Sequence, residues 1–359
     1  MRTGVISLLV VVSAAALVAA QPAAAREVQK AIWARGPTNG VSEFPTYRQL
    51  GVKIVESQLN WSTIARTRPS DPTNPDDPAY RWPADVDSAS QQAQLFGMKQ
   101  LLEVSETPGW ANGGQDARYP PTATSDYTDF IVAASRRYPA VRLWLIWSEA
   151  CSHFRFLPIT PQPFGKPVMP AARVQPQAYA TLLDASYATL KQLDPKNVVI
   201  GGGTWAACDF RPIDWAHYLK LPDGRRPRMD LWSNNPYVVI APKQVPTAWK
   251  VSDIYGLPRL QAAIDHYFGK KHRIGLFVSE FTMPTRPDAE FPIYTSERGQ
   301  AKYTKQLFDI SRKLGTVAAI GWLELYDLPP VQGETEGHNG GLLHQDGTKK
   351  PAFNVFRRE

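Results

Sequence analysis

The chain of 359 residues is 43% hydrophobic, 11% aromatic and 20% charged, which allows a large buried core and excludes an intrinsically disordered chain. Its formal net charge of +7 is spread along the sequence and not gathered in a basic arm, so nucleic acid is not expected as a partner. The six histidines and two cysteines show no metal-ligand spacing, so we expect no metal and no cofactor.

The first 25 residues have the pattern of a secretory signal peptide. Arg2 gives the positive start, Val5 to Ala20 form an apolar stretch, and Ala23 to Ala25 form a small-residue cleavage signal. A retained membrane anchor is the alternative, although the apolar stretch is shorter than the ~20 residues that a spanning helix needs. We therefore predict an exported protein of the periplasm, cell envelope or surroundings, without a membrane span after signal removal.

Strand-like and helix-like runs alternate along residues 26–359, a pattern typical of a parallel sheet with crossover helices. The length fits one elaborated α/β barrel, so we predict a single, monomeric (β/α)8 TIM-barrel domain. The eight predicted strands are Val28 to Trp33, Val52 to Asn60, Met98 to Val104, Val141 to Trp147, Val198 to Gly202, Met229 to Ser233, Ile274 to Ser279 and Val317 to Leu323. The predicted helices are Thr38 to Leu50, Val86 to Phe96, Ser125 to Tyr138, Pro176 to Leu193, Leu257 to Phe268 and Ser296 to Leu314.

Long irregular insertions follow the second, fourth and sixth predicted strands, at Thr63 to Trp82, Cys151 to Val174 and Val238 to Tyr255. The loops that follow barrel strands build the site in this architecture. We expect these three segments to form the walls of a cleft.

Two glutamates, Glu149 and Glu280, stand where predicted buried strands end. A carboxylate there is costly to desolvate, yet this is the face on which α/β barrels place catalytic groups. Glycosidic cleavage needs one carboxylic acid to protonate the departing oxygen and one carboxylate to face the anomeric carbon. Ordinary helix-capping or ion-pair roles are the alternative interpretation.

The motifs around these glutamates resemble those of clan A of the glycoside hydrolases, the four-seven superfamily. The matching segments are Trp147-Ser148-Glu149-Ala150 and Ser279-Glu280-Phe281, and further similarity runs from Thr107 to Asn112 and through the carboxyl-terminal part of the chain. The resemblance implies that Glu149 is the acid/base and Glu280 the nucleophile of a retaining mechanism. It also implies that Tyr237 hydrogen-bonds the nucleophile and that Trp322 floors the sugar subsite.

Three positions depart from the clan pattern. Ser148 replaces the asparagine that holds the sugar 2-hydroxyl, Asn235 replaces a histidine, and Glu56 stands where many members have an arginine near the nucleophile. We expect Glu56 inside the barrel mouth, within reach of the catalytic carboxylates or of a basic residue, where a like charge raises a carboxyl pKa. These departures indicate an unusual sugar or lost catalysis.

Other residues have two interpretations each. Trp110 and Trp205 suit sugar-stacking platforms, but tryptophan in a barrel of this size is also often core, and the same applies to Trp61 and Trp232. The remaining candidates for polar contacts with a sugar, each with a structural alternative, are Glu103, Glu106, Glu324, His153 and His338.

The only two cysteines, Cys151 and Cys208, follow the adjacent fourth and fifth strands. Neighbouring strands lie about 4.8 Å apart, which brings the Cα separation of a disulfide within reach. We predict this disulfide, with two buried free thiols as the alternative.

The predicted function is therefore a secreted retaining glycoside hydrolase that acts on a polysaccharide or glycoconjugate. The second hypothesis is a carbohydrate-binding pseudoenzyme that keeps the barrel but not the turnover. A purely structural barrel would explain neither glutamate.

Overall fold

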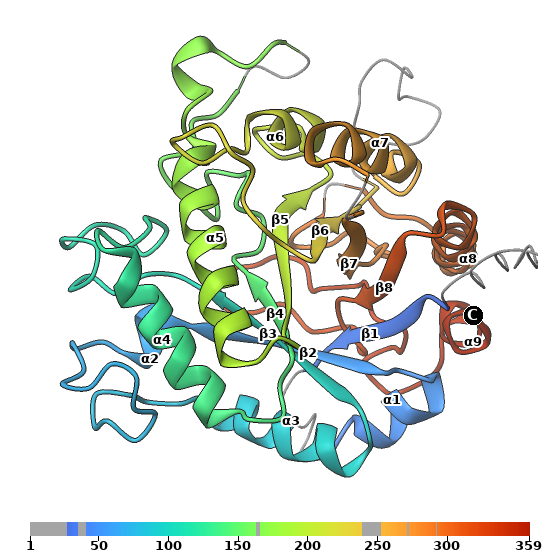
Figure 1. The fold of residues 1–359 in the computed structure, drawn as a ribbon. Coiled ribbons are helices and arrows are strands. Elements are labelled where there is room, and N and C mark those ends of the chain that lie inside the picture. The colour runs from blue at the N-terminus through green and yellow to red at the C-terminus, as the bar shows by residue number, and fades with distance from the viewer. Residues whose placement is uncertain (1–26, 35–40, 163–165, 239–252, 271–272, 292) are drawn as a thin grey trace, which may run out of the picture.

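The computed structural model describes residues 27–34, 41–162, 166–238, 253–270, 273–291 and 293–359. In this part of the chain eight parallel strands close into a barrel in sequence order, with helices around it (Figure 1). The predicted (β/α)8 fold is confirmed. The predicted signal peptide and most of the predicted wall Val238 to Tyr255 lie outside the described residues.

All eight predicted strands are present, with shifted ends. β1 and β8 close the barrel through parallel pairs such as Ala31 with Gly321. The fourth strand is shorter than predicted and the fifth is longer. Glu149 therefore lies three residues beyond the end of the fourth strand, whereas Glu280 lies inside the seventh strand. The bounds are β1 Gln29–Trp33, β2 Ile54–Asn60, β3 Lys99–Ser105, β4 Leu143–Ile146, β5 Val198–Trp205, β6 Leu231–Asn235, β7 Gly275–Phe281 and β8 Val317–Trp322.

The helices include all six predicted ones and several short ones that the periodicity did not reveal. In the described part of the first predicted helix the structure has α1, Phe44–Leu50, which starts with a proline in its first turn. The others are α2 Trp61–Ile64, α3 Ala84–Leu95, α4 Thr124–Arg137, α5 Pro176–Leu193, α6 Pro212–Tyr218, α7 Leu257–Phe268, α8 Glu297–Leu314 and α9 Pro351–Arg358, with a 3-10 turn η1 at Pro170–Ala172. Figure 1 shows α9, the carboxyl-terminal helix, beside α8.

The barrel interior changes from apolar to polar along the strands. One cluster of buried apolar side chains fills the interior with a residue from most strands, such as Ala31, Ile54 and Ala319. Because strand side chains alternate between faces, the positions two residues further along also face inward. On β2, β3 and β7 these positions are Glu56, Glu103 and Ser279, which are buried and polar, so a polar layer lies above the apolar one.

Candidate active site

The two predicted catalytic glutamates line one cavity at the carboxyl-terminal mouth of the barrel. This cavity, the polar compartment, has a volume of about 350 Å³, and Glu149 and Glu280 lie in its wall together with Trp33, Glu103 and Arg155. It occupies the face on which α/β barrels carry their active sites. The structure therefore brings the two predicted carboxylates together in the wall of one cavity.

Glu149 is held by a strained loop that follows β4. Trp147 and Glu149 adopt φ angles of 58° and 53°, in a left-handed region that costs a non-glycine residue roughly 1–3 kcal/mol. The loop packs against β5 at Gly203, where an added Cβ would meet the Trp147 carbonyl oxygen at 2.6 Å. Only glycine allows this close approach of the two backbones, so the glycine run of β5 helps to place Glu149.

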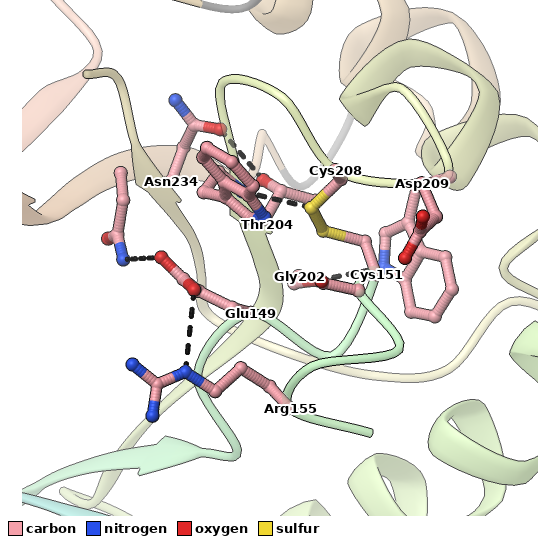
Figure 2. The surroundings of a disulfide bond; sticks show 12 residues. Glu149, Cys151, Arg155, Gly202, Thr204, Cys208, Asp209 and Asn234 are labelled. Atoms are coloured by element: carbon pink, nitrogen blue, oxygen red, sulfur yellow. Dashed lines mark hydrogen bonds and ion pairs between the residues drawn. A yellow bond between two sulfur atoms is a disulfide. The ribbon is translucent and has the colours of Figure 1, made fainter. Parts of the chain in front are cut away.

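The Glu149 carboxyl has one neutral and one cationic partner (Figure 2). The Asn235 side-chain amide donates a hydrogen bond to Oε1 at 2.8 Å, and Arg155 Nε lies 3.7 Å from Oε2. Burial raises the pKa of Glu149 above its usual range, and the Arg155 charge and the Asn235 hydrogen bond only partly oppose that rise. A carboxyl with a raised pKa can act as a general acid.

Glu280 projects from β7, next to an irregularity in its pairing with β8. The ladder shifts register between Val278 and Phe281, and such irregularities re-aim side chains beside active sites. The Tyr237 hydroxyl donates a hydrogen bond of 2.7 Å to Glu280 Oε2, the contact that the clan resemblance implied. Burial and the Glu149 charge raise the pKa of Glu280, whereas the Tyr237 hydrogen bond lowers it.

Asn235 links the surroundings of the two glutamates. Its amide nitrogen donates to Glu149, and its oxygen accepts a hydrogen bond of 2.6 Å from the Ser279 hydroxyl. Ser279 directly precedes Glu280 in β7. The asparagine that replaces the clan histidine therefore connects the acid/base candidate to the strand that carries the nucleophile candidate.

Glu56 lies inside the barrel, as expected, but does not line the polar compartment. Its side chain is fully buried against Gly321, where an added Cβ would overlap Oε1. Neither carboxyl oxygen has a hydrogen-bond partner among the described residues. Burial first, then the charges of Glu280 and Glu103, raise the pKa of Glu56 well above its usual range. Glu56 is therefore not placed for direct contact with a ligand in this compartment, and it can act only through the carboxylates near it.

The predicted place of Trp322 at the floor of a sugar subsite is also wrong. The ring is fully buried, packs edge-on against Phe281 and Phe356 at centroid distances of 5.7 Å, and donates to the Gly340 carbonyl. Alternation along β8 explains this, because Trp322 faces the helices while the next residue, Leu323, lines the polar compartment.

Trp110 takes part in packing and does not line the polar compartment or the cavity beside it. Its indole N–H donates to the Ala65 carbonyl at 2.7 Å, its ring meets Trp61 edge-on, and Arg68 lies over it. Trp61 and Trp232 are fully buried core residues. The tryptophans that do line the polar compartment are Trp33 and Trp147. Sequence analysis missed Trp33, although its alternation with Ala31 on β1 indicated an inward side chain.

A second cavity of about 380 Å³, the aromatic compartment, adjoins the first and shares Glu149, Phe154, Arg155 and Glu290 with it. Trp205 lines it as predicted for a platform, and its indole nitrogen is buried without a hydrogen-bond partner among the described residues. The rest of its wall includes two more aromatic side chains, Tyr237 and Phe291, whose rings lie 4.7 Å apart.

The predicted disulfide between Cys151 and Cys208 is present, with 5.6 Å between the Cα atoms (Figure 2). It joins the loop after β4 to the loop after β5, two residues beyond Glu149. A second link lies beside it, because Asp209 accepts hydrogen bonds from the backbone nitrogen of His153 at 2.7 Å and contacts the ring Nδ1 at 2.6 Å. His153 therefore has a structural partner and does not line either compartment.

The remaining candidates divide between the cavity and its supports. Ser148 and Glu103 are buried and line the polar compartment, and the Ser148 backbone nitrogen donates to Glu103 at 3.2 Å. Glu106 also lines it and accepts a hydrogen bond from Ser62. Glu324 is buried, accepts from the Gly340 backbone nitrogen, and does not line the compartment. His338 lies 3.8 Å from Glu334 and lines neither compartment.

Arg155 and Glu290, which line both compartments, were not singled out from the sequence. Both lie in irregular loops, where no periodicity indicates the direction of a side chain. Within the described residues, no group of three or more histidine, cysteine, aspartate or glutamate side chains could hold a metal ion. None of the described helices is long and apolar enough to cross a membrane.

No protein-family model matches this sequence, and no curated protein matches it. Solved structures do share its fold. A family 39 glycoside hydrolase from the gut symbiont Bacteroides cellulosilyticus aligns with a TM-score of 0.62 and 16% identity over 93% of this chain and 63% of that chain. A GH39 β-xylosidase from Caulobacter crescentus aligns with a TM-score of 0.61 and 17% identity over 95% of this chain and 72% of that one.

A β-glucuronidase from Bacteroides uniformis has a TM-score of 0.55 and 13% identity over 92% of this chain and 35% of its own. The chain thus spans less than two thirds of the length of the first of these structures. The similarity to clan A glycoside hydrolases that the motifs predicted is confirmed in the fold. Identities this low establish the fold alone.

Proposed function

We propose that the protein is an exported, monomeric retaining glycoside hydrolase, with Glu149 as acid/base and Glu280 as nucleophile. The observation that carries the proposal is that two buried carboxyl groups line one cavity and have different hydrogen-bond partners, Asn235 for Glu149 and Tyr237 for Glu280. Glycosidases need two carboxyl groups in different protonation states.

In the first step, protonated Glu149 gives its proton to the glycosidic oxygen while ionised Glu280 attacks the anomeric carbon, and a covalent glycosyl-enzyme forms as the leaving group departs. In the second step, ionised Glu149 takes a proton from water, and the water oxygen displaces Glu280. The Tyr237 hydrogen bond favours the ionised form of Glu280, and Arg155 favours the ionised form of Glu149 between the steps.

We expect a carbohydrate substrate, either a polysaccharide or a glycoconjugate of the envelope or surroundings. The polar and aromatic compartments meet at Glu149, so a substrate can place its glycone in the first and its leaving group in the second. Retention also predicts that the two carboxyl groups lie about 5 to 5.5 Å apart, whereas a separation near ~9 Å would indicate inversion.

The second candidate function is carbohydrate binding without turnover. The observation in its favour is the raised pKa of Glu280, because a protonated carboxyl is no nucleophile. The two functions differ in whether any product is released.

The test is a panel of chromogenic glycosides, including xylosides and glucuronides because structural neighbours carry those names, incubated with wild type and with Glu280→Gln. We expect release that Glu280→Gln lowers on the order of 10⁴-fold while its thermal unfolding stays cooperative. NMR of the first sugar product should show retained configuration. Equal release by both proteins would exclude Glu280 as nucleophile, and sugar binding without any release would favour the pseudoenzyme.

A further inference from the structure

The polar compartment carries an excess of carboxylates over cations. Five glutamates but only two arginines line it. Glu56 lies inside the barrel, where the charge of Glu280 raises its pKa. Two of the five, Glu149 and Glu280, are already assigned to the proposed reaction. The others have no part in that chemistry, and Glu103 is the most buried of them, with 3% of its surface exposed.

The two arginines have other partners. Arg118 pairs with Asp116 at 2.8 Å and donates to the His153 carbonyl at 3.1 Å, and Arg155 lies 3.7 Å from Glu149. Among the described residues no basic side chain lies within ion-pair distance of Glu103. Burial raises the pKa of Glu103 to about 7, and the hydrogen bond from the Ser148 backbone and the charge of Arg155 only partly oppose that rise.

The hydrogen-bond partners of Glu103 are neutral. Its Oε1 accepts from the Ser148 backbone nitrogen at 3.2 Å and from the Gln58 amide at 3.4 Å. Beside it Ser148 lines the same compartment, and its hydroxyl is buried without a hydrogen-bond partner among the described residues. A carboxylate and a free hydroxyl acceptor on one wall match a ligand group that has several N–H donors and a positive charge.

We propose that this compartment selects a glycone that carries a protonated amine, that is, an amino sugar, and that Glu103 together with the Ser148 hydroxyl binds the ammonium group. Ser148 precedes Glu149 in the chain, so the ammonium would lie close to the bond that is cleaved. This assignment rests on the proposed function. The same charges disfavour a uronic acid, because its carboxylate would lose its hydration shell beside several like charges.

Binding can be measured without turnover, by calorimetry on the full exported protein at pH 7. The ligands are the methyl glycosides of glucosamine, N-acetylglucosamine, glucose and glucuronic acid, with the galacto series in parallel. We expect the amine to bind about 10- to 100-fold more tightly than the neutral sugar of the same series, as hydrogen bonds to a charged group allow. The N-acetyl sugar tests whether the charge, and not the nitrogen, is recognised.

Glu103→Gln should remove most of the preference for the amine over the neutral sugar. Glu106→Gln is the matched control, because Glu106 lines the same compartment but already accepts a hydrogen bond from Ser62. We expect it to change the ratio of the two affinities by less than about threefold, as for a weakly coupled charge. Thermal unfolding of both variants excludes a trivial loss of fold.

The outcomes separate this inference from the proposed function. If a neutral glycoside is cleaved in a Glu280-dependent way but amine and neutral sugars bind equally, or the uronate binds best, the amino-sugar assignment is wrong and the glycosidase assignment stands. If the amine binds selectively through Glu103 but no glycoside of either series is cleaved, the selectivity stands and turnover is excluded. Equal losses in Glu103→Gln and Glu106→Gln would contradict the role of Glu103.

Discussion

The two candidate catalytic glutamates are positioned by opposite means. Glu280 lies within β7, where the sheet fixes its backbone and only the local register shift turns it into the cavity. Glu149 lies beyond β4 in a loop with two left-handed non-glycine residues, held by the disulfide, by Asn235 and by Arg155.

The contrast has a functional reason in the proposed mechanism. A nucleophile must meet one carbon atom at a fixed distance, which a strand end provides. An acid/base must approach first a leaving oxygen and then a water, and a crosslinked loop can hold it near both. Changes to the β4 loop should therefore affect proton transfer, whereas changes around β7 should affect attack at carbon.

The sharpest way to separate the two positions is to remove each carboxyl. In Glu149→Ala, kcat should fall roughly 10²- to 10⁴-fold on substrates with poor leaving groups, which is the range for loss of a general acid. Added azide should restore part of the turnover, because a small anionic nucleophile needs no general base, and the glycosyl azide should keep its configuration. Glu280→Ala should show a larger fall in kcat and should give no azide product of retained configuration. Product analysis by NMR checks both, and rescue of the opposite variant would reverse the assignment.

Removal of the disulfide should affect the loop after β4, which carries Glu149, and not β7, which carries Glu280. Replacing Cys151 and Cys208 together by serine opens a loop of 57 positions, and the chain-entropy estimate is about 4 kcal/mol of unfolding free energy, to be measured by denaturant titration. Because Glu149 lies in the loop that the disulfide holds, kcat should fall further for substrates with poor leaving groups than for activated substrates, which need no protonation. Equal losses on both substrate types would mean that the bridge stabilises the fold without positioning the acid.

Tyr237→Phe tests how the surroundings of Glu280 on β7 control its ionisation. The ring should keep its contact with Phe291, but the hydrogen bond that lowers the pKa of Glu280 is lost. The pKa of Glu280 should rise, so the limb of the pH profile that reports its ionisation should move to higher pH. We expect kcat/KM to fall about tenfold at neutral pH, as for a lost hydrogen bond to a charged group. A profile that only scales down, without moving, would exclude control of the Glu280 pKa by Tyr237.

Glu56→Gln should give the smallest effect on activity and a pH-dependent effect on stability. The pKa of Glu56 is raised in the folded state, so its contribution to stability is fully present below the unfolded value of about 4.3 and is lost as the pH rises toward the folded pKa. The variant should therefore become more stable than wild type as the pH increases from 4 to 8, by melting temperature, while exposed Glu336→Gln should show no such trend. Unchanged melting and pH–rate profiles would contradict coupling of Glu56 to the cavity carboxylates.

Much of the architecture was determined by local sequence. Alternating apolar runs and amphipathic stretches fix the eight strands and the long helices, because burial of each apolar face depends on period alone. The arrival of Glu149 and Glu280 at one mouth of the barrel, and the proximity of Cys151 and Cys208 after adjacent strands, follow from strand order in a closed barrel.

The directions of individual side chains were decided only by the tertiary structure. A one-residue difference in alternation places Trp322 among the helices and Leu323 in the wall of the cavity. Glu56 is fully buried near the carboxylates and does not line the cavity. Arg155 reaches Glu149 from an irregular loop whose path depends on the disulfide and on the close approach to Gly203. Sequence patterns specify which face of a regular element is buried, but strand ends and loops have no period, so contacts distant in sequence determine where their side chains point.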